Sequence, residues 1–147
     1  MARDEADFGA RAVAGEDIYS QEVDVFAPCA LGAELNGRTS PQLRARVVAG
    51  AANNRLECAE HGANLAARNI LCASDYVINA GGVINLSYER ESGYERNMAM
   101  AHIARIYEIA MKIFDRAKRE GRPTSKIVDD MAQELLGAHG PAVDEMT

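Results

Sequence analysis

The sequence contains few cysteines and lysines, no long apolar run and no excess of positive charge. Its three cysteines, Cys29, Cys58 and Cys72, are widely spaced and form no Cys-x-x-Cys pair, which favours reduced thiols and a cytoplasmic location. No apolar run approaches the ~20 residues that span a membrane, and the acidic start MARDEADF is unlike a signal peptide. The net charge of -6 argues against nucleic acid as a partner, because phosphate groups are bound by clustered lysine and arginine.

Chain length and composition are typical of one globular domain. A chain of 147 residues can bury ~70% of the surface that it exposes when unfolded. Its 48% of hydrophobic and 26% of charged residues are those of a folded protein, not of a disordered chain. We therefore expect a single domain over residues 1–147, with a sheet-containing half at about 8–89, a helical half at about 90–136 and a flexible tail at 137–147.

The first half alternates short β-rich runs with segments long enough for helices. The runs cover residues 23–27, 46–50 and 69–73, and the last is expected to continue through Ser74 and Asp75 into residues 76–78. Residues 56–68 have the length of a crossover helix between parallel strands. A weaker run at 12–14 is a further candidate edge strand. This order predicts an α/β fold with a parallel sheet of about three to four strands, followed by C-terminal helices.

The second half is predicted to form two helices. Apolar residues recur at helical spacing within 97–120, and Gly121-Arg122-Pro123 ends that helix. Thr124 or Ser125 can cap the next helix. The side chains expected in the core are Ile103, Ile106, Tyr107, Ala110, Ile113, Phe114, Ala117, Ile127, Val128, Met131 and Leu135, with Met98, Met100 and Met111 as gap fillers.

Three loops rich in small residues and asparagine follow the three strands, at residues 28–32, 50–54 and 79–82. In a parallel sheet the carboxyl ends of neighbouring strands share one edge, where ligands bind, so the loops should converge on one crevice. Small residues let a ligand approach the backbone, and the amides of Asn53 and Asn79 suit a carboxylate or carboxamide. Each loop alone is better explained as a turn that requires Gly and Asn, but three such loops at one edge favour a binding site.

The segments VDVFAPCALGAELN, VVAGAANNRL and DYVINAGGVIN resemble successive segments of the leucine, valine and phenylalanine dehydrogenases, within the Glu/Leu/Phe/Val dehydrogenase superfamily. The resemblance runs from about Phe8 to Glu89, with a weaker helical continuation to about Glu134. It implies a truncated Rossmann-like sheet, the latter part of an NAD-binding domain, followed by that family's C-terminal helices. It also implies amino-acid dehydrogenase (oxidoreductase) ancestry.

The resemblance implies a cofactor side and a carboxylate side for the crevice. Ala30 and Leu31 would lie beside the nicotinamide end of NAD. Asn53 would hold the substrate carboxylate near that ring.

The same resemblance implies a substrate pocket in the third loop. Asn79, with the Gly81-Gly82 backbone, would form its floor. Val83 and Leu86 would line the slot for an aliphatic side chain, although Leu86 is larger than the valine expected from the family.

Several parts of the family's catalytic machinery are absent from the sequence. The only lysines, Lys112, Lys118 and Lys126, lie in the helical half, so no lysine is placed to activate water or hold a carboxylate. The dinucleotide motif Gly-x-Gly-x-x-Gly and the acidic residue ending the second strand are missing, so NAD is implied by the resemblance but lacks its pyrophosphate site. Asp75 is the one acid next to the third motif, and it fits a turn cap better than a catalyst.

Other candidate sites have less support. Cys58 and His61 have a spacing found in some zinc sites, but no second pair accompanies them, so no metal is expected. Cys29 lies in the predicted crevice and could act as a nucleophile, whereas the resemblance explains it as a small packing residue.

Three functions remain open at this point. The chain could be a repurposed enzyme or binder of a small amino-acid-like or keto-acid-like carboxylate. It could instead be a partner-dependent subunit of a split NAD-dependent amino-acid dehydrogenase, or a non-catalytic interaction module. Because the strand at 23–27 lacks a neighbour, its edge is expected to be covered by the segment near Val13 or by a second subunit, and the helix at 97–120 is a second candidate dimer surface.

Overall fold

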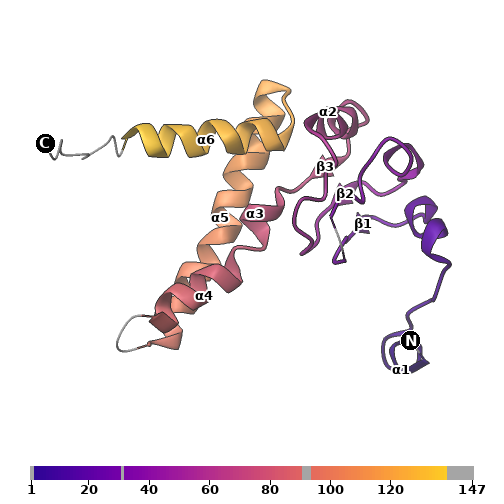
Figure 1. Ribbon diagram of the computed structural model, residues 1–147, viewed down its shortest axis with the longest axis horizontal. Coiled ribbons are helices and arrows are strands. Elements are labelled where there is room, and N and C mark those ends of the chain that lie inside the picture. The colour runs from indigo at the N-terminus through magenta and orange to yellow at the C-terminus, as the bar shows by residue number, and fades with distance from the viewer. Residues whose placement is uncertain (1, 31, 91–93, 139–147) are drawn as a thin grey trace, which may run out of the picture.

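The protein folds into a small parallel sheet followed by a block of helices (Figure 1). The computed structural model describes residues 2–30, 32–90 and 94–138. In chain order the elements are α1 (Ala2–Phe8), the 3-10 helix η1 (Gly15–Ser20), β1 (Val25–Phe26), the 3-10 helix η2 (Ser40–Gln42), β2 (Val47–Val48), α2 (Ala59–Ala67), β3 (Leu71–Cys72), α3 (Asp75–Ile78), α4 (Gly81–Arg90), α5 (Arg96–Glu120) and α6 (Thr124–Ala138).

The three predicted strands form one parallel sheet in the order β1-β2-β3. Val47 of β2 pairs with Val25 on one side and with Leu71 on the other. Helix α2 supplies the crossover from β2 to β3, as parallel strands require. The α/β fold class and the three-stranded parallel sheet are therefore confirmed.

Residues 76–78, predicted to extend the third strand, belong to helix α3 instead. β2 ends at Val48, and its pairing with β3 ends at Cys72, so no described strand lies beside residues 76–78. The backbone N–H groups of Val77 and Ile78 donate to the carbonyl of Ser74 at 3.3 and 3.1 Å. This local bonding replaces the missing ladder bonds, and the expected strand becomes a helical turn.

Residues 12–14 form no strand, so the prediction of an additional edge strand is wrong. Within the described part of the chain, nothing pairs with the outer edge of β1. Tyr19 of η1 packs its ring against that of Phe26 with the centroids 5.5 Å apart, which covers a face of β1 but not its edge. Val25 remains 51% exposed.

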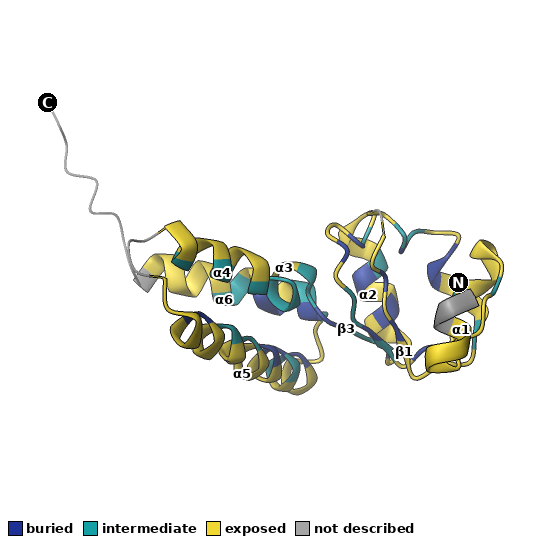
Figure 2. Cartoon of the chain, turned by 90° about the horizontal axis from the view of Figure 1, so that it is seen from below, coloured by how far each residue is buried: buried dark blue, intermediate teal, exposed yellow. Residues whose placement is uncertain are grey.

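Buried residues lie in both halves of the molecule (Figure 2). Among the described residues they form two apolar clusters. The first lies between the sheet, the surrounding loops and α2, and consists of Phe26, Leu35, Leu43, Ala45, Val48, Leu65 and Ile70. The second joins α5 to α6 and consists of Ile113, Ala117, Ile127 and Val128. Thr124, at the start of α6, donates its hydroxyl hydrogen to the carbonyl of Cys72 in β3, which connects the two halves.

Helix α5 ends as predicted, because Gly121 adopts the left-handed conformation (φ 63°). Neither Thr124 nor Ser125 caps α6, since the Thr124 hydroxyl bonds to β3 and the Ser125 hydroxyl has no partner among the described residues. Helix α6 continues to Ala138, and residues 139–147, most of the predicted tail, lie outside the described residues.

Part of the predicted helical core is exposed. Tyr107 and Leu135 are 73% and 63% exposed, and Met98, Met100 and Met111 are exposed as well. Helical spacing identified the buried side of α5 correctly, but it overestimated the width of that side.

An ion-pair network joins the end of α5 to α6. Arg116 donates to both carboxylate oxygens of Glu134 at 3.0 and 2.9 Å, and to Glu120 at 2.8 Å. Arg122 donates to Glu120 at 3.0 Å and to Asp130 at 2.7 Å. The hydrogen bond from Arg116 lowers the pKa of Glu120 below its ordinary 4.5, and that from Arg122 lowers the pKa of Asp130 below 3.8.

We expect Arg116→Met to lower the melting temperature at neutral pH and to have less effect in acid. Because the folded-state pKa of Glu120 is depressed, its contribution is complete above the ordinary pKa of 4.5 and is lost as the pH falls through the folded-state pKa. Thermal unfolding followed by circular dichroism at about pH 7 and about pH 3 measures this difference. Arg119→Met, at an exposed position of the same helix, is the control. A loss of stability that does not depend on pH would contradict the prediction.

Candidate binding crevice

The three loops that follow the strands meet at one edge of the sheet. Gly50 lies directly against the backbone of Pro28, where a Cβ atom would overlap the Pro28 carbonyl group. The backbone N–H of Ala52 donates to the Pro28 carbonyl at 3.0 Å. Further along, Leu35 and Leu56 form an isolated parallel bridge between the same two loops.

The third loop joins the second through two asparagines. The side-chain amide nitrogen of Asn79 donates to the side-chain oxygen of Asn53, and it lies 3.4 Å from the carbonyl oxygen of Ala51. Asn79 is the C-cap residue of α3, whereas Asn53 lies in the loop after β2. The structure thus brings together the two amides that the sequence singled out.

The other predicted site residues lie on α4 or in the first loop. Gly81 and Gly82 belong to the first turn of α4, and neither has the positive φ that an open glycine turn would use. Val83 and Leu86 are 72% and 55% exposed on that helix. Ala30 is exposed in the first loop.

The prediction for Leu31 cannot be placed, because Leu31 lies outside the described residues.

Asp75 accepts a hydrogen bond from the backbone N–H of Tyr76 at 2.9 Å. The Cys29 sulfur accepts a hydrogen bond from the backbone N–H of Ala51 at 3.4 Å. His61 contacts Glu57 at 3.3 Å. Over residues 2–30, 32–90 and 94–138, no group of three metal-ligating side chains is present.

Residues 3–131 match the Glutamate/Leucine/Phenylalanine/Valine dehydrogenase family. The chain belongs to this family. Leucine dehydrogenase of Geobacillus stearothermophilus is 49% identical over 136 residues, which are 92% of this chain and 37% of that protein. L-tryptophan dehydrogenase of Nostoc punctiforme is 44% identical over 130 residues, 88% of this chain and 36% of the relative.

Solved structures of dehydrogenases in this family show the same fold. The crystal structure of L-tryptophan dehydrogenase from Nostoc punctiforme superposes with a TM-score of 0.86 at 43% identity, over 90% of this chain and 40% of that one. A glutamate dehydrogenase from Thermus thermophilus agrees in fold alone, at 20% identity and a TM-score of 0.66. The chain thus spans about 37% of the length of the leucine dehydrogenase that it matches. None of the described helices is long and apolar enough to cross a membrane.

The residues present do not fit the dinucleotide that the dehydrogenase family implies. A pyrophosphate is held by a glycine-rich turn at the N-terminus of a helix, and the sequence contains no such motif. Within the described residues, the regular element after β1 is the three-residue 3-10 helix η2. Of the two residues that the family resemblance implies beside a nicotinamide, Ala30 is exposed and Leu31 lies outside the described residues.

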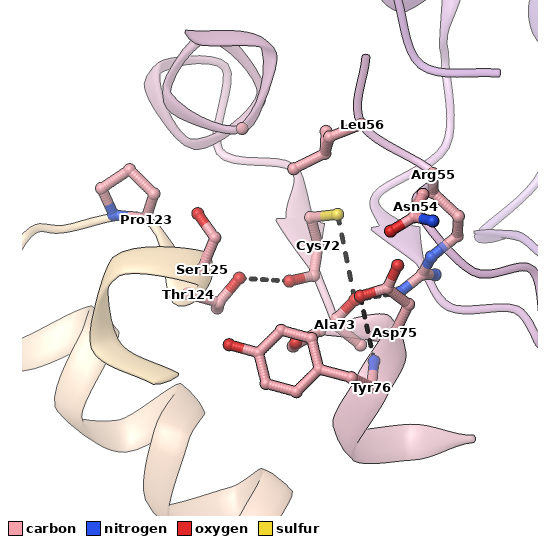
Figure 3. Close-up of a pocket in the computed structure, with 12 residues that line it drawn as sticks. Asn54, Arg55, Leu56, Cys72, Ala73, Asp75, Tyr76, Pro123, Thr124 and Ser125 are labelled. Carbon is pink, nitrogen blue, oxygen red and sulfur yellow. Dashed lines mark hydrogen bonds between the residues drawn. The ribbon is translucent and has the colours of Figure 1, made fainter. Parts of the chain in front are cut away.

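Sequence reasoning missed Arg55, which is 2% exposed and lies two residues after Asn53 in the loop that follows β2. Its guanidinium donates to the carbonyl of Ala73 beside a cavity of about 210 Å³ (Figure 3). Burial raises the pKa of the nearby Glu34 carboxyl, and a hydrogen bond from the Ala30 backbone and the charge of Arg55 oppose that rise. No pattern of spacing distinguishes a buried arginine from the exposed ones, so the sequence offered no signal for it.

Proposed function

We propose that this chain binds a small amino-acid-like or keto-acid-like carboxylate at the edge of the sheet where Asn53 and Asn79 meet. One observation carries the proposal: two amides from different loops meet at the carboxyl edge of the parallel sheet. That edge is where open α/β sheets bind ligands. Membership of an amino-acid dehydrogenase family supports the ligand class.

The hydrogen bond between the two amides leaves groups free for a ligand. Since Asn79 donates to Asn53, the side-chain N–H groups of Asn53 and the side-chain oxygen of Asn79 have no hydrogen-bond partner among the described residues. A carboxylate accepts from the N–H groups, and the oxygen accepts from an amine. Val83 and Leu86, exposed on α4, supply apolar surface for an aliphatic side chain.

We propose binding, or a repurposed reaction, rather than hydride transfer by this chain alone. Lys112, Lys118 and Lys126 are exposed on α5 and α6, so no lysine comes from the loops that form the crevice. Without such a group, the family's carbon–nitrogen chemistry has no evident acid or base here.

Thermal unfolding of the chain with branched amino acids, their 2-keto acids or NAD(H), each added alone, tests the proposal. A ligand present at 100 times its Kd should stabilise the fold by about 2.7 kcal/mol. Asn53→Ala and Asn79→Ala should each remove most of that stabilisation.

Asn64→Ala is the matched control, because Asn64 is exposed on α2, away from the strand ends. This variant should respond to the ligand as the native chain does. If no compound stabilises the protein, or if the Asn53→Ala, Asn79→Ala double variant keeps the full response, the proposal is wrong.

The open edge of β1 favours a second candidate, a partner-dependent subunit of an amino-acid dehydrogenase. The backbone oxygens of Asp24 and Phe26 accept hydrogen bonds from the β2 segment. Successive residues of a strand direct their backbone N–H and C=O groups to opposite edges, so those of Val25, which lies between them, face the unpaired edge. A partner chain or a second copy could pair there and supply the missing lysines. This candidate predicts NAD-linked amino-acid oxidation only after a partner is added.

A third role, as a non-catalytic interaction module, predicts that Asn53→Ala and Asn79→Ala leave function intact.

A further inference from the structure

Arg55 is hydrogen-bonded to the loops on both sides of its own. Its backbone carbonyl accepts from the N–H of Leu35, in the loop after β1, at 2.9 Å. Its guanidinium donates through Nη2 to the carbonyl of Ala73, which follows β3 (Figure 3). One residue therefore joins the carboxyl ends of all three strands.

Asn54 separates the exposed Asn53 from the buried Arg55. Asn54 adopts a left-handed conformation, with φ of 52°, which asparagine tolerates better than most residues. Asn53 before it is exposed to solvent, whereas Arg55 after it is buried. Only one residue separates Ala73 from α3, whose C-cap is Asn79. The hydrogen bond from Arg55 to Ala73 therefore links two short segments of the chain, one of which contains Asn53 and the other Asn79.

The burial of this guanidinium is poorly explained by stability. Its Nη1 is buried and has no hydrogen-bond partner within the described ranges. The Oε2 atom of Glu34 is likewise buried without a hydrogen-bond partner there. No ion pair within 4.0 Å joins these two residues among the salt bridges of the described chain. A buried charge without a full set of partners costs free energy, so stability alone does not explain the burial of Arg55.

We propose that Arg55 is a positioning residue, which sets the separation of the Asn53 and Asn79 amides by tying the three loops together. The proposal rests on the function proposed above, because the same two amides form the binding site. Arg55 itself does not touch the ligand.

Nuclear magnetic resonance of the protein without ligand tests the positioning role directly. The side-chain amide signals of Asn53 and Asn79 are assigned from the Asn53→Ala and Asn79→Ala variants. In Arg55→Met, which keeps most of the aliphatic stem but has no donor, both pairs of signals should move toward those of free asparagine. Should Arg55→Met fail to fold, Arg55→Lys replaces it, because a lysine keeps the charge but lacks the planar fork.

Arg68→Met provides the matched control. Arg68 also donates to two backbone carbonyls, those of Ser40 and Leu43, both at 2.5 Å, but it does so away from the asparagine pair. This variant should lose stability while the Asn53 and Asn79 amide signals stay in place. Unchanged signals in the Arg55 variant, or equal changes in the Arg68 variant, would show that Arg55 is merely structural.

A binding measurement separates this proposal from the proposed function. With a 2-keto acid as the probe, Arg55→Met should raise the Kd by about tenfold or more, while Arg68→Met leaves the Kd unchanged. If the native chain binds no such ligand, the proposed function fails but the amide signals still decide the role of Arg55. If the native chain binds and Arg55→Met binds equally well, the positioning role is wrong.

Discussion

Replacing Gly50 by alanine is expected to lower the free energy of unfolding by about 3 kcal/mol, the upper part of the range for overpacking. A Cβ atom at this position would overlap the backbone of Pro28, including its carbonyl carbon and oxygen. A crowded side chain can rotate away, but a backbone segment must move with its loop. That movement would also disturb the bond from Ala52 to the Pro28 carbonyl. Urea unfolding followed by circular dichroism measures the change.

Gly137→Ala is the control for Gly50→Ala. Gly137 lies in α6 with open space around its Cα and no positive φ. Alanine there should stabilise the protein by about 0.5–1 kcal/mol, because glycine is unfavourable inside a helix. If the Gly50→Ala variant has the same urea midpoint as the native protein, the two loops do not approach as closely as the structure indicates.

Ile127→Ala is expected to cost about 3 kcal/mol, within the range for truncating a fully buried aliphatic side chain. Ile127 is 0% exposed and packs with Ile113, Ala117 and Val128 between α5 and α6. Its removal leaves a cavity at the point where α6 also reaches β3. The same urea experiment should show a lower midpoint, and α6 should become more accessible to hydrogen exchange.

Leu136→Ala tests whether burial causes that effect. Leu136 lies on the same helix but is 74% exposed, so its truncation should change stability by no more than about 0.5 kcal/mol. Equal losses from the two variants would mean that the α5–α6 cluster does not hold the helices together.

Much of the architecture followed from the sequence, because local patterns carry it. The β-rich runs around Val25, Val47 and Leu71 became the three parallel strands, and the segment between the last two contains the crossover helix. Gly121 ended α5 as expected, because glycine adopts the left-handed conformation at little cost. The order of strands and loops was sufficient to predict that Asn53 and Asn79 share one edge.

The errors arose where distant contacts override local preference. The apolar stretch at 76–78 favours a strand by composition, but no strand of the sheet extends far enough to pair with it. Tyr107 and the methionines of α5 have the spacing of a buried face, yet the helices that pack on α5 cover a narrower side. Periodicity reports which side of a helix is apolar, not how much of it another element covers.

The sequence by itself determined the family and the parallel sheet, because strand order and motif spacing are written along the chain. It also predicted that the loops after the strands meet at one edge of the sheet. Only the tertiary structure decided that the Asn53 and Asn79 amides bond to each other and that Arg55 is buried. It also showed that Gly50 must be a glycine because Pro28 lies against it. These facts depend on the distance between segments remote in sequence, and that distance is set by how the loops pack once the strands have paired.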